Sequence, residues 1–199
     1  SLGVLSYTGC RPFSVDRDGI VLGEGSAVFF MENLDDAILR GAHIYAEIVN
    51  YSLTADAESL SRPSEKGIIK ALEKALMNVD LKKVDYINAH GTGTKLNDIT
   101  EISAITKVFG PLSSNLFISS TKSMHGHLLG ASGAIELLAC ILAIEKNIIP
   151  PTINITKQDP AINNVILNTS TVNHGVNIAI SNSFAFGGIN TIIVISKFC

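Results

Sequence analysis

The fold of this chain is decided by residues 121–133, which read Thr-Lys-Ser-Met-His-Gly-His-Leu-Leu-Gly-Ala-Ser-Gly. This stretch combines a lysine, two histidines and three glycines, and it leads directly into an apolar run over residues 131–146. Burying charged and titratable groups without partners is costly. Groups of this kind beside an apolar helix therefore predict a polar site with its own internal partners.

Two further glycine-rich stretches are expected to meet the first one. Residues 88–94 read Asn-Ala-His-Gly-Thr-Gly-Thr, and residues 182–188 read Asn-Ser-Phe-Ala-Phe-Gly-Gly. Each of the three stretches follows an apolar run, and sheets of parallel strands bind ligands at the carboxyl ends of the strands. We interpret the three stretches as one site.

The composition excludes several classes of protein. The chain has 199 residues, of which 46% are hydrophobic and 17% charged, so it is one large domain or part of a larger protein with faces that another unit covers. The net charge of −3 and the scattered Lys and Arg residues argue against nucleic-acid binding. No apolar run reaches the ~18 residues of a membrane span, and we expect no signal peptide. Three cysteines, Cys10, Cys140 and Cys199, fit a reducing compartment, and we expect a cytoplasmic protein.

Hydrophobic periodicity predicts a regular α/β pattern from residue 43 onwards. The pattern predicts strands over residues 44–51, 84–89 and 116–118, which alternate with helices over residues 64–78, 97–109 and 131–146. Further strands are predicted over residues 165–168, 176–182 and 190–196, the last two as antiparallel neighbours. The order predicts a parallel sheet with an antiparallel addition. The helix over 131–146 is apolar nearly all round, which places it at the centre of the fold.

Residues before 43 belong to none of these repeats. They include a predicted strand over residues 27–32 and a predicted short helix over residues 34–40. Since the chain also begins without Met, we interpret residues 1–42 as the tail of a preceding unit and residues 43–199 as the main unit.

Four motifs in order identify a resemblance. They are Arg17-Asp18-Gly19-x-x-x-Gly23-Glu24-Gly25, His90-Gly91-Thr92-Gly93-Thr94, Lys122-Ser123-x-x-Gly126-His127 and Asn182-Ser183-Phe184-x-Phe186-Gly187-Gly188-x-Asn190. Over its whole length the chain resembles the C-terminal half of a β-ketoacyl synthase. The resemblance implies a thiolase-like α/β fold, with a five-stranded parallel-plus-antiparallel sheet and a central helix buried between layers.

The resemblance also implies an activity. Such enzymes, acyltransferases of fatty-acid or polyketide synthesis, carry out a decarboxylative Claisen condensation of malonyl-acyl carrier protein with an enzyme-bound acyl thioester. Nothing in the chain matches the motif of the nucleophilic cysteine, so the resemblance places that cysteine in a missing N-terminal half. Cys10 has a loop setting and is not expected to replace it.

The resemblance assigns His90 and His127 to stabilise the enolate that decarboxylation creates. The residues alone predict an ion pair between Lys122 and Glu136, since a carboxylate within an apolar helix needs a counter-charge. The resemblance makes them an active-site salt bridge. His125 matches no histidine of the family, and we expect local packing for it.

The resemblance implies further roles in the loops. Phe186, Gly187 and Gly188 are expected to form the acyl oxyanion hole and a gate, with Asp56 in a second loop that moves with it. Thr92 and Thr94 are expected to bind pantetheine, although hydroxyls in such a loop also cap turns.

The sequence does not decide whether two acidic residues have a functional or a structural role. Asp98 and Glu101 match acidic positions of the family, and they equally suit the start of a helix.

We expect no metal and no cofactor, because phosphopantetheine arrives on the acyl carrier protein. The expected partners are acyl carrier protein and the N-terminal half of the synthase, in a homodimer or in a ketosynthase/chain-length-factor heterodimer. Two alternatives remain: a non-catalytic partner subunit of the chain-length-factor type, and a thiolase. The two histidine motifs together with Lys122 argue against the thiolase.

Overall fold

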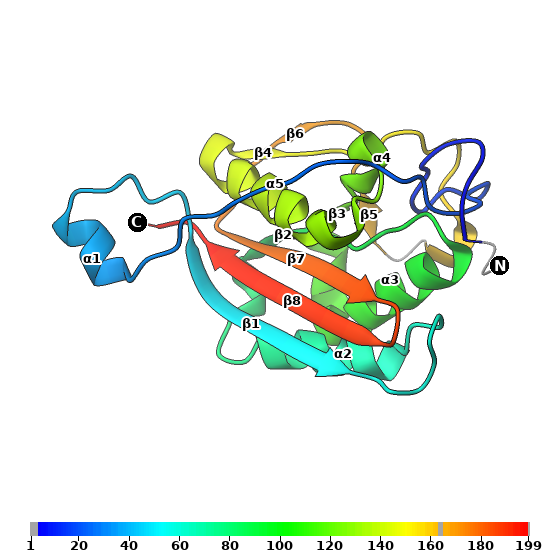
Figure 1. Cartoon of the computed structure of the whole chain (residues 1–199), viewed down its shortest axis with the longest axis horizontal. Coiled ribbons are helices and arrows are strands. Elements are labelled where there is room, and N and C mark those ends of the chain that lie inside the picture. Colours follow the sequence, from blue (N-terminus) through cyan, green and yellow to red (C-terminus); the bar gives the residue numbers. More distant parts are fainter. Residues whose placement is uncertain (1–3, 163–164, 199) are drawn as a thin grey trace.

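A mixed sheet forms the middle of the molecule in the computed structural model, which describes residues 4–162 and 165–198 (Figure 1). Its strand order is β1-β8-β7-β2-β3-β5. The strands are β1 (Glu47–Ala55), β2 (Val84–Asn88), β3 (Phe117–Ser119), β5 (Ile166–Leu167), β7 (Ile178–Ala185) and β8 (Ile189–Ser196). Strands β7, β2, β3 and β5 run parallel, whereas β8 is antiparallel to both β7 and β1. The expected antiparallel pair is confirmed, and the short strand β5 makes the sheet six-stranded rather than five-stranded.

Helices cover the two faces of this sheet. Helices α2 (Glu65–Ala75) and α3 (Lys95–Phe109) pack on one face, and α5 (Ser132–Lys146) lies on the other (Figure 1). Successive residues of a strand point to opposite faces. Accordingly, Ile87 packs with α2 and α3, whereas its neighbour Tyr86 packs with α5. None of the helices in the described part of the chain is long and apolar enough to cross a bilayer.

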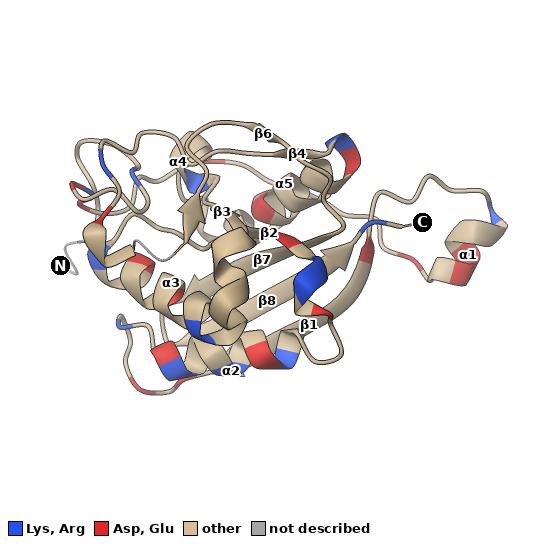
Figure 2. Ribbon diagram, turned by 180° about the vertical axis from the view of Figure 1, so that it is seen from behind, with Lys and Arg blue, Asp and Glu red and all other residues tan. Residues whose placement is uncertain are grey.

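The helix ends follow from local chemistry. Ser64 precedes α2 and its side chain accepts the N–H of Gly67, as N-cap residues do. Helix α5 ends at Asn147, which adopts the left-handed conformation that terminates many helices. On the surface, α2 carries interspersed acidic and basic residues (Figure 2).

Smaller elements complete the structure. They are α1 (Leu34–Leu39), α4 (Lys122–His125), a second sheet of β4 (Ile148–Ile149) with β6 (Val172–Asn173), and the 3-10 turns Leu81–Lys83, Gly110–Asn115, Leu129–Ala131 and Pro160–Ile162.

The predicted strand over residues 27–32 is wrong for this structure. Among the described residues this extended segment has no neighbouring strand with which to hydrogen bond, and a strand exists only as part of a ladder. Val28 and Phe30 are 96% and 84% exposed. The segment leads into α1, which stands away from the body of the molecule (Figure 1).

The glycine-rich loop predicted between the last two strands is shorter than expected. Strand β7 continues to Ala185 and β8 begins at Ile189, so the turn consists of Phe186, Gly187 and Gly188. Both glycines have positive φ, +86° and +76°, which residues with a side chain rarely adopt.

Helix α5 is covered on one side in this chain. Leu137, Cys140 and Ile144 pack against the sheet, whereas Leu138 and Leu142 on the other side are 37% and 43% exposed. The predicted burial of α5 on all sides is therefore not observed within the described residues.

Residues 4–23 contact the main unit closely. Phe13 is fully buried in the core that α2 and α3 share, and Leu22 pairs with His127 in a β-bridge. The boundary between residues 42 and 43 stays a prediction, and the segment before it supplies part of the core.

Candidate active site

The sheet brings the three glycine-rich stretches to one edge. Strands β2, β3 and β7 are parallel neighbours, so the residues that follow β2 and β3 and those at the end of β7 lie together. His90 follows β2, Lys122 follows β3, and Phe184 lies near the end of β7. The structure thus places residues from all three stretches at the edge where the sequence predicted a site.

Lys122 connects His90 to Glu136 in the interior. Its Nζ donates to Glu136 Oε1 and to the carbonyl oxygen of His90, the latter at 2.6 Å. The same Nζ lies 3.3 Å from Nδ1 of His90. Both the lysine and the glutamate side chains are fully buried. Burial raises the pKa of Glu136, and the ammonium of Lys122 opposes that shift.

The two histidines that the sequence singled out face each other. The ring centroids of His90 and His127 are 5.5 Å apart, with the rings nearly perpendicular at 87°. The backbone N–H of Leu129 donates to Nδ1 of His127 at 3.1 Å. His127 is also held by its own backbone, which donates to Val21 at 2.7 Å.

Both imidazoles are neutral near pH 7. The pKa of His90 is lowered well below its usual value by burial and then by the charge of Lys122. Burial, followed by the charge of Lys122, lowers the pKa of His127 to about 4. Because Nδ1 of each ring faces a donor, the ring hydrogen resides on Nε2. The pair therefore presents two uncharged N–H donors.

Glu101 is a buried support for the His90 loop. Its carboxylate accepts the N–H groups of His90 and Gly91, each at 2.8 Å, and Nδ2 of Asn182 at 3.0 Å. Burial raises its pKa to about 7, against the opposing effect of these three donors. Glu101 lies beyond the first turn of α3, in which Asp98 is the acidic residue, and its match to an acidic position of the family stays a prediction.

Asp98 is also buried and connects the N-terminal segment to α3. It accepts the N–H of Phe13 at 2.9 Å and pairs with the fully buried Arg17 at 3.2 Å. Burial raises its pKa, and the Phe13 hydrogen bond and the Arg17 charge oppose the shift. Arg17 also forms an ion pair with Asp159, so its guanidinium links the N-terminal segment to α3 and to the loop around residue 159.

The two threonines of the His90 loop contact each other. Their hydroxyl oxygens are 3.0 Å apart, and the N–H of Thr94 donates to Oγ1 of Thr92 at 3.4 Å. This is the turn-capping contact that the sequence had left as the alternative to pantetheine binding.

The residues that the resemblance assigned to a gate form a second cluster at the β7–β8 turn. Phe186 is 53% exposed. Asp56 donates its backbone N–H to the carbonyl of Gly188 at 2.8 Å, and its carboxylate accepts Nδ2 of Asn190 at 2.7 Å. The N–H of Gly187 donates to the carbonyl of Leu60 at 2.8 Å. The loop after β1 and the β7–β8 turn are therefore joined in this structure.

The remaining candidates lie outside the histidine pair. His125 is half-buried, with Nδ1 2.8 Å from its neighbour's carbonyl and Nε2 3.1 Å from Oγ1 of Thr121, which is the expected local packing. Burial raises the pKa of the Cys10 thiol to about 11, so it is protonated at neutral pH. Burial also raises the pKa of Cys140, and Cys199 lies outside the described residues.

Sequence reasoning assigned no role to two residues beside the histidines, although both lie in the quoted glycine-rich stretches. Phe184 stacks edge-on against His90, with ring centroids 5.4 Å apart. Ser132, at the start of α5, places Oγ 2.9 Å from Nδ1 of His127. A period-2 count along β7 could have found Phe184, which lies two residues from the buried Asn182. The contact of Ser132 depends on the path of the loop before α5, which no local pattern gives.

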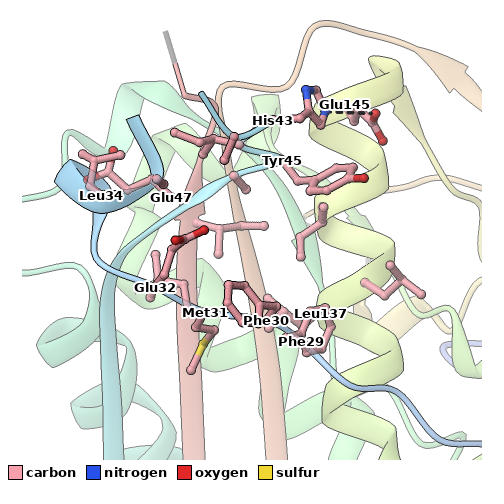
Figure 3. A pocket seen from close by; sticks show the side chains of 18 of the residues that line it. Phe29, Phe30, Met31, Glu32, Leu34, His43, Tyr45, Glu47, Leu137 and Glu145 are labelled. Carbon is pink, nitrogen blue, oxygen red and sulfur yellow. Dashed lines mark ion pairs between the residues drawn. The ribbon is translucent and has the colours of Figure 1, made fainter. Parts of the chain in front are cut away.

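A pocket lies apart from this site. It has a volume of about 640 Å³ and is lined by residues 28–32 and 42–48 together with the outer side of α5 (Figure 3). Apolar side chains such as Phe29 and Leu137 make up much of its wall, and Glu32, Glu47 and Glu145 are its acidic members. Within residues 4–162 and 165–198, no three His, Cys, Asp or Glu residues are grouped as a metal site.

The strand order and the helices on both faces define the chain as part of a thiolase-like α/β fold. Residues 45–156 match the family model "Beta-ketoacyl synthase, C-terminal domain". The chain belongs to the β-ketoacyl synthase family.

Two named relatives are consistent with this family. It is 44% identical over 195 residues to nodulation protein E of Rhizobium sp. (97% of this chain, 48% of that protein). It is 45% identical over 192 residues to 3-oxoacyl-[acyl-carrier-protein] synthase 2 of Synechocystis sp. (94% and 46%). The chain thus spans about half the length of these relatives.

Solved structures are similar over nearly the whole chain. The ishigamide ketosynthase/chain length factor superposes with a TM-score of 0.93 at 40% identity, over 99% of this chain and 49% of that one. A type II polyketide synthase ketosynthase in complex with its acyl-carrier protein gives a TM-score of 0.95 at 35% identity, over 100% and 51%.

Proposed function

We propose that this chain is the C-terminal half of a β-ketoacyl synthase that condenses malonyl-acyl carrier protein with an acyl group held on a cysteine of the N-terminal half. The observation that carries the proposal is the pair of neutral imidazoles, 5.5 Å apart between centroids, with both Nδ1 atoms facing donors. A centroid separation of 5.5 Å is short enough for one oxygen between the rings to accept a hydrogen bond from each, which supports the proposal.

In the proposed reaction the malonyl thioester loses CO₂, and the electron pair of the broken C–C bond forms an enolate. His90 and His127 donate to its oxygen, and each such donor contributes about 2.7–4 kcal/mol of barrier lowering. The enolate carbon then attacks the acyl thioester carbonyl. The cysteine leaves as thiolate, and the product is a β-ketoacyl thioester on the carrier protein.

Lys122 holds His90 in the required tautomer. An ammonium near Nδ1 places the ring hydrogen on Nε2, and it disfavours protonation of the ring through its charge. Glu136 balances the buried lysine, since an isolated buried ammonium is costly.

The loops are proposed to bind the substrate and to close over it. The proposed acyl oxyanion hole uses the backbone N–H of Phe186, and Gly187 and Gly188 give the turn its freedom. Asp56 contacts Gly188 and Asn190, which supports coupled movement of the two loops. Thr92 and Thr94 are proposed to exchange their mutual hydrogen bond for bonds to the pantetheine amides of the carrier protein.

The proposed structural partner is the N-terminal half. The outer side of α5 and the segment over residues 27–32 expose apolar side chains, including Leu142, Val28 and Phe30. Exposed apolar surface of this kind marks an interaction site.

A second candidate is a partner subunit of the chain-length-factor type, because one similar structure is a ketosynthase/chain length factor. The presence of His90, Lys122 and His127 in one cluster favours the catalytic function instead.

The test uses the complete natural protein that contains residues 1–199. Acyl-acyl carrier protein should transfer its acyl group to a cysteine, seen as a mass increase of the protein, and malonyl-acyl carrier protein should release CO₂. A protein that does neither, while it binds a second ketosynthase subunit, is a partner subunit.

A further inference from the structure

Ser132 contacts the His127 ring from the start of α5. It is buried at 4% exposure, and its Oγ lies 2.9 Å from Nδ1 of His127. The backbone N–H of Leu128 donates to the same Oγ at 2.8 Å. None of the four sequence motifs includes this residue.

The direction of these hydrogen bonds follows from the groups involved. An amide N–H can only donate, so Oγ of Ser132 is the acceptor for Leu128, and the hydroxyl hydrogen remains free. That hydrogen points to Nδ1 of His127, which is unprotonated because the N–H of Leu129 also donates to it. Two donors thus meet at Nδ1 of His127.

The hydroxyl of Ser132 belongs to a more rigid part of the chain than the backbone N–H of Leu129. Leu129 has a φ of +53° and is 64% exposed. A left-handed conformation is disfavoured for a residue with a side chain. Ser132 instead belongs to the first turn of a fifteen-residue helix that packs on the sheet. The helix therefore fixes the ring where the loop alone would leave it free to turn.

We propose that Ser132 is a positioning residue for His127, whose hydroxyl keeps the ring hydrogen on Nε2 and keeps the ring turned toward His90. Its importance for catalysis rests on the proposed function, whereas the effect on the ring itself does not.

The first measurement is the tautomer of His127 by ¹⁵N NMR, in the complete natural protein labelled at histidine. The His127 resonances are assigned by their loss in His127→Gln. The expected result for the unaltered protein is a pyrrole-type Nε2 and a pyridine-type Nδ1. A protonated Nδ1 would overturn the proposal without any variant.

The second measurement compares Ser132→Ala with Ser132→Thr, which keeps the hydroxyl. Ser132→Ala should mix the two tautomers and lower kcat for malonyl decarboxylation about tenfold with little change in KM, the size of one hydrogen bond. Ser132→Thr should retain both properties. The matched control is Ser113→Ala, which removes an equally buried hydroxyl that donates to Gly110 away from the site.

The outcomes separate the two proposals. Mixed tautomers in Ser132→Ala in a protein that never decarboxylates malonyl thioesters would support the positioning role and contradict the proposed function. An unchanged tautomer together with unchanged decarboxylation in Ser132→Ala would overturn the positioning role and leave the function standing. If Ser132→Ala fails to fold, Ser132→Gly removes the same hydroxyl from the first turn of α5 and takes its place in both measurements.

Discussion

The ammonium nitrogen of Lys122 lies 3.3 Å from Nδ1 of His90 and 2.6 Å from the carbonyl oxygen of the same residue. One buried cation thus holds both the ring and the backbone of the histidine. It also pairs with Glu136, so the histidine is connected to the first turns of α5.

Removal of the charge from Lys122 should lower both the stability and the activity, and the two effects should have different causes. Lys122→Met leaves Glu136 buried without a partner, and breaking a buried pair in this way typically costs about 3–5 kcal/mol. The double variant with Glu136→Leu should recover much of that loss in chemical denaturation, because no charge is left unpaired. It should not recover malonyl decarboxylation, since His90 still lacks its ammonium. Full recovery of activity in the double variant would show that the charge has no catalytic role.

The two histidines of the 121–133 stretch should differ sharply on substitution. His127→Ala removes one of the two proposed enolate donors and should lower kcat for malonyl decarboxylation by about 10²–10³-fold. His125→Ala removes contacts to Thr121 and to a backbone carbonyl, and it should leave the rate near normal. Release of CO₂ from malonyl-acyl carrier protein measures both. Equal losses in the two variants would mean that the assignment of His127 is mistaken.

Local sequence patterns predicted most of the fold. Apolar periodicity located α2, α3 and α5, and the buried carboxylate of Glu136 required a partner that proved to be Lys122. The segment over residues 27–32 was predicted wrongly, because a run of apolar residues is typical of a strand but cannot supply the neighbouring strand that it needs.

The supporting residues of the site could not be predicted in the same way. Arg17 and Asp98 are 81 positions apart in the sequence, and their pairing depends on where the N-terminal segment crosses α3. The contact of Ser132 with His127 likewise depends on a turn through Leu129, whose positive φ is unusual for leucine and has no sequence signal.

Acid should destabilise the protein partly through His127. Its pKa is about 4 in the folded protein against 6.5 as the ordinary value, so the unfolded chain binds more protons between these pH values. The stability is complete above pH 6.5 and falls as the pH is lowered toward 4. His127→Gln cannot take up this proton, so its free energy of unfolding should depend less on pH in that range. Urea denaturation at several pH values compares the two proteins, and parallel curves would contradict the shift.

The contact of Asp56 with the β7–β8 turn should require glycine at position 188. A Cβ built there would lie 2.8 Å from Cβ of Asp56, and Gly188 also has a positive φ. Gly188→Ala should therefore destabilise the protein by about 1 kcal/mol or more. Gly130→Ala is the control, because a Cβ on Gly130 meets no atom within 4 Å. Equal unfolding midpoints for the two variants would show that the turn adapts without cost.

Residues 1–199 expressed alone should associate or remain partly unfolded. The outer side of α5 exposes Leu138 and Leu142, and the extended segment exposes Val28 and Phe30, so apolar surface meets water on two neighbouring elements. Light scattering after size exclusion should report oligomers, and a dye for apolar surface should bind. Leu138→Lys with Leu142→Lys should reduce the association, because the charges lie on the exposed side of the helix. A monodisperse monomer with one cooperative thermal transition would show that this surface needs no partner, and it would remove the structural argument for an N-terminal half packed against α5.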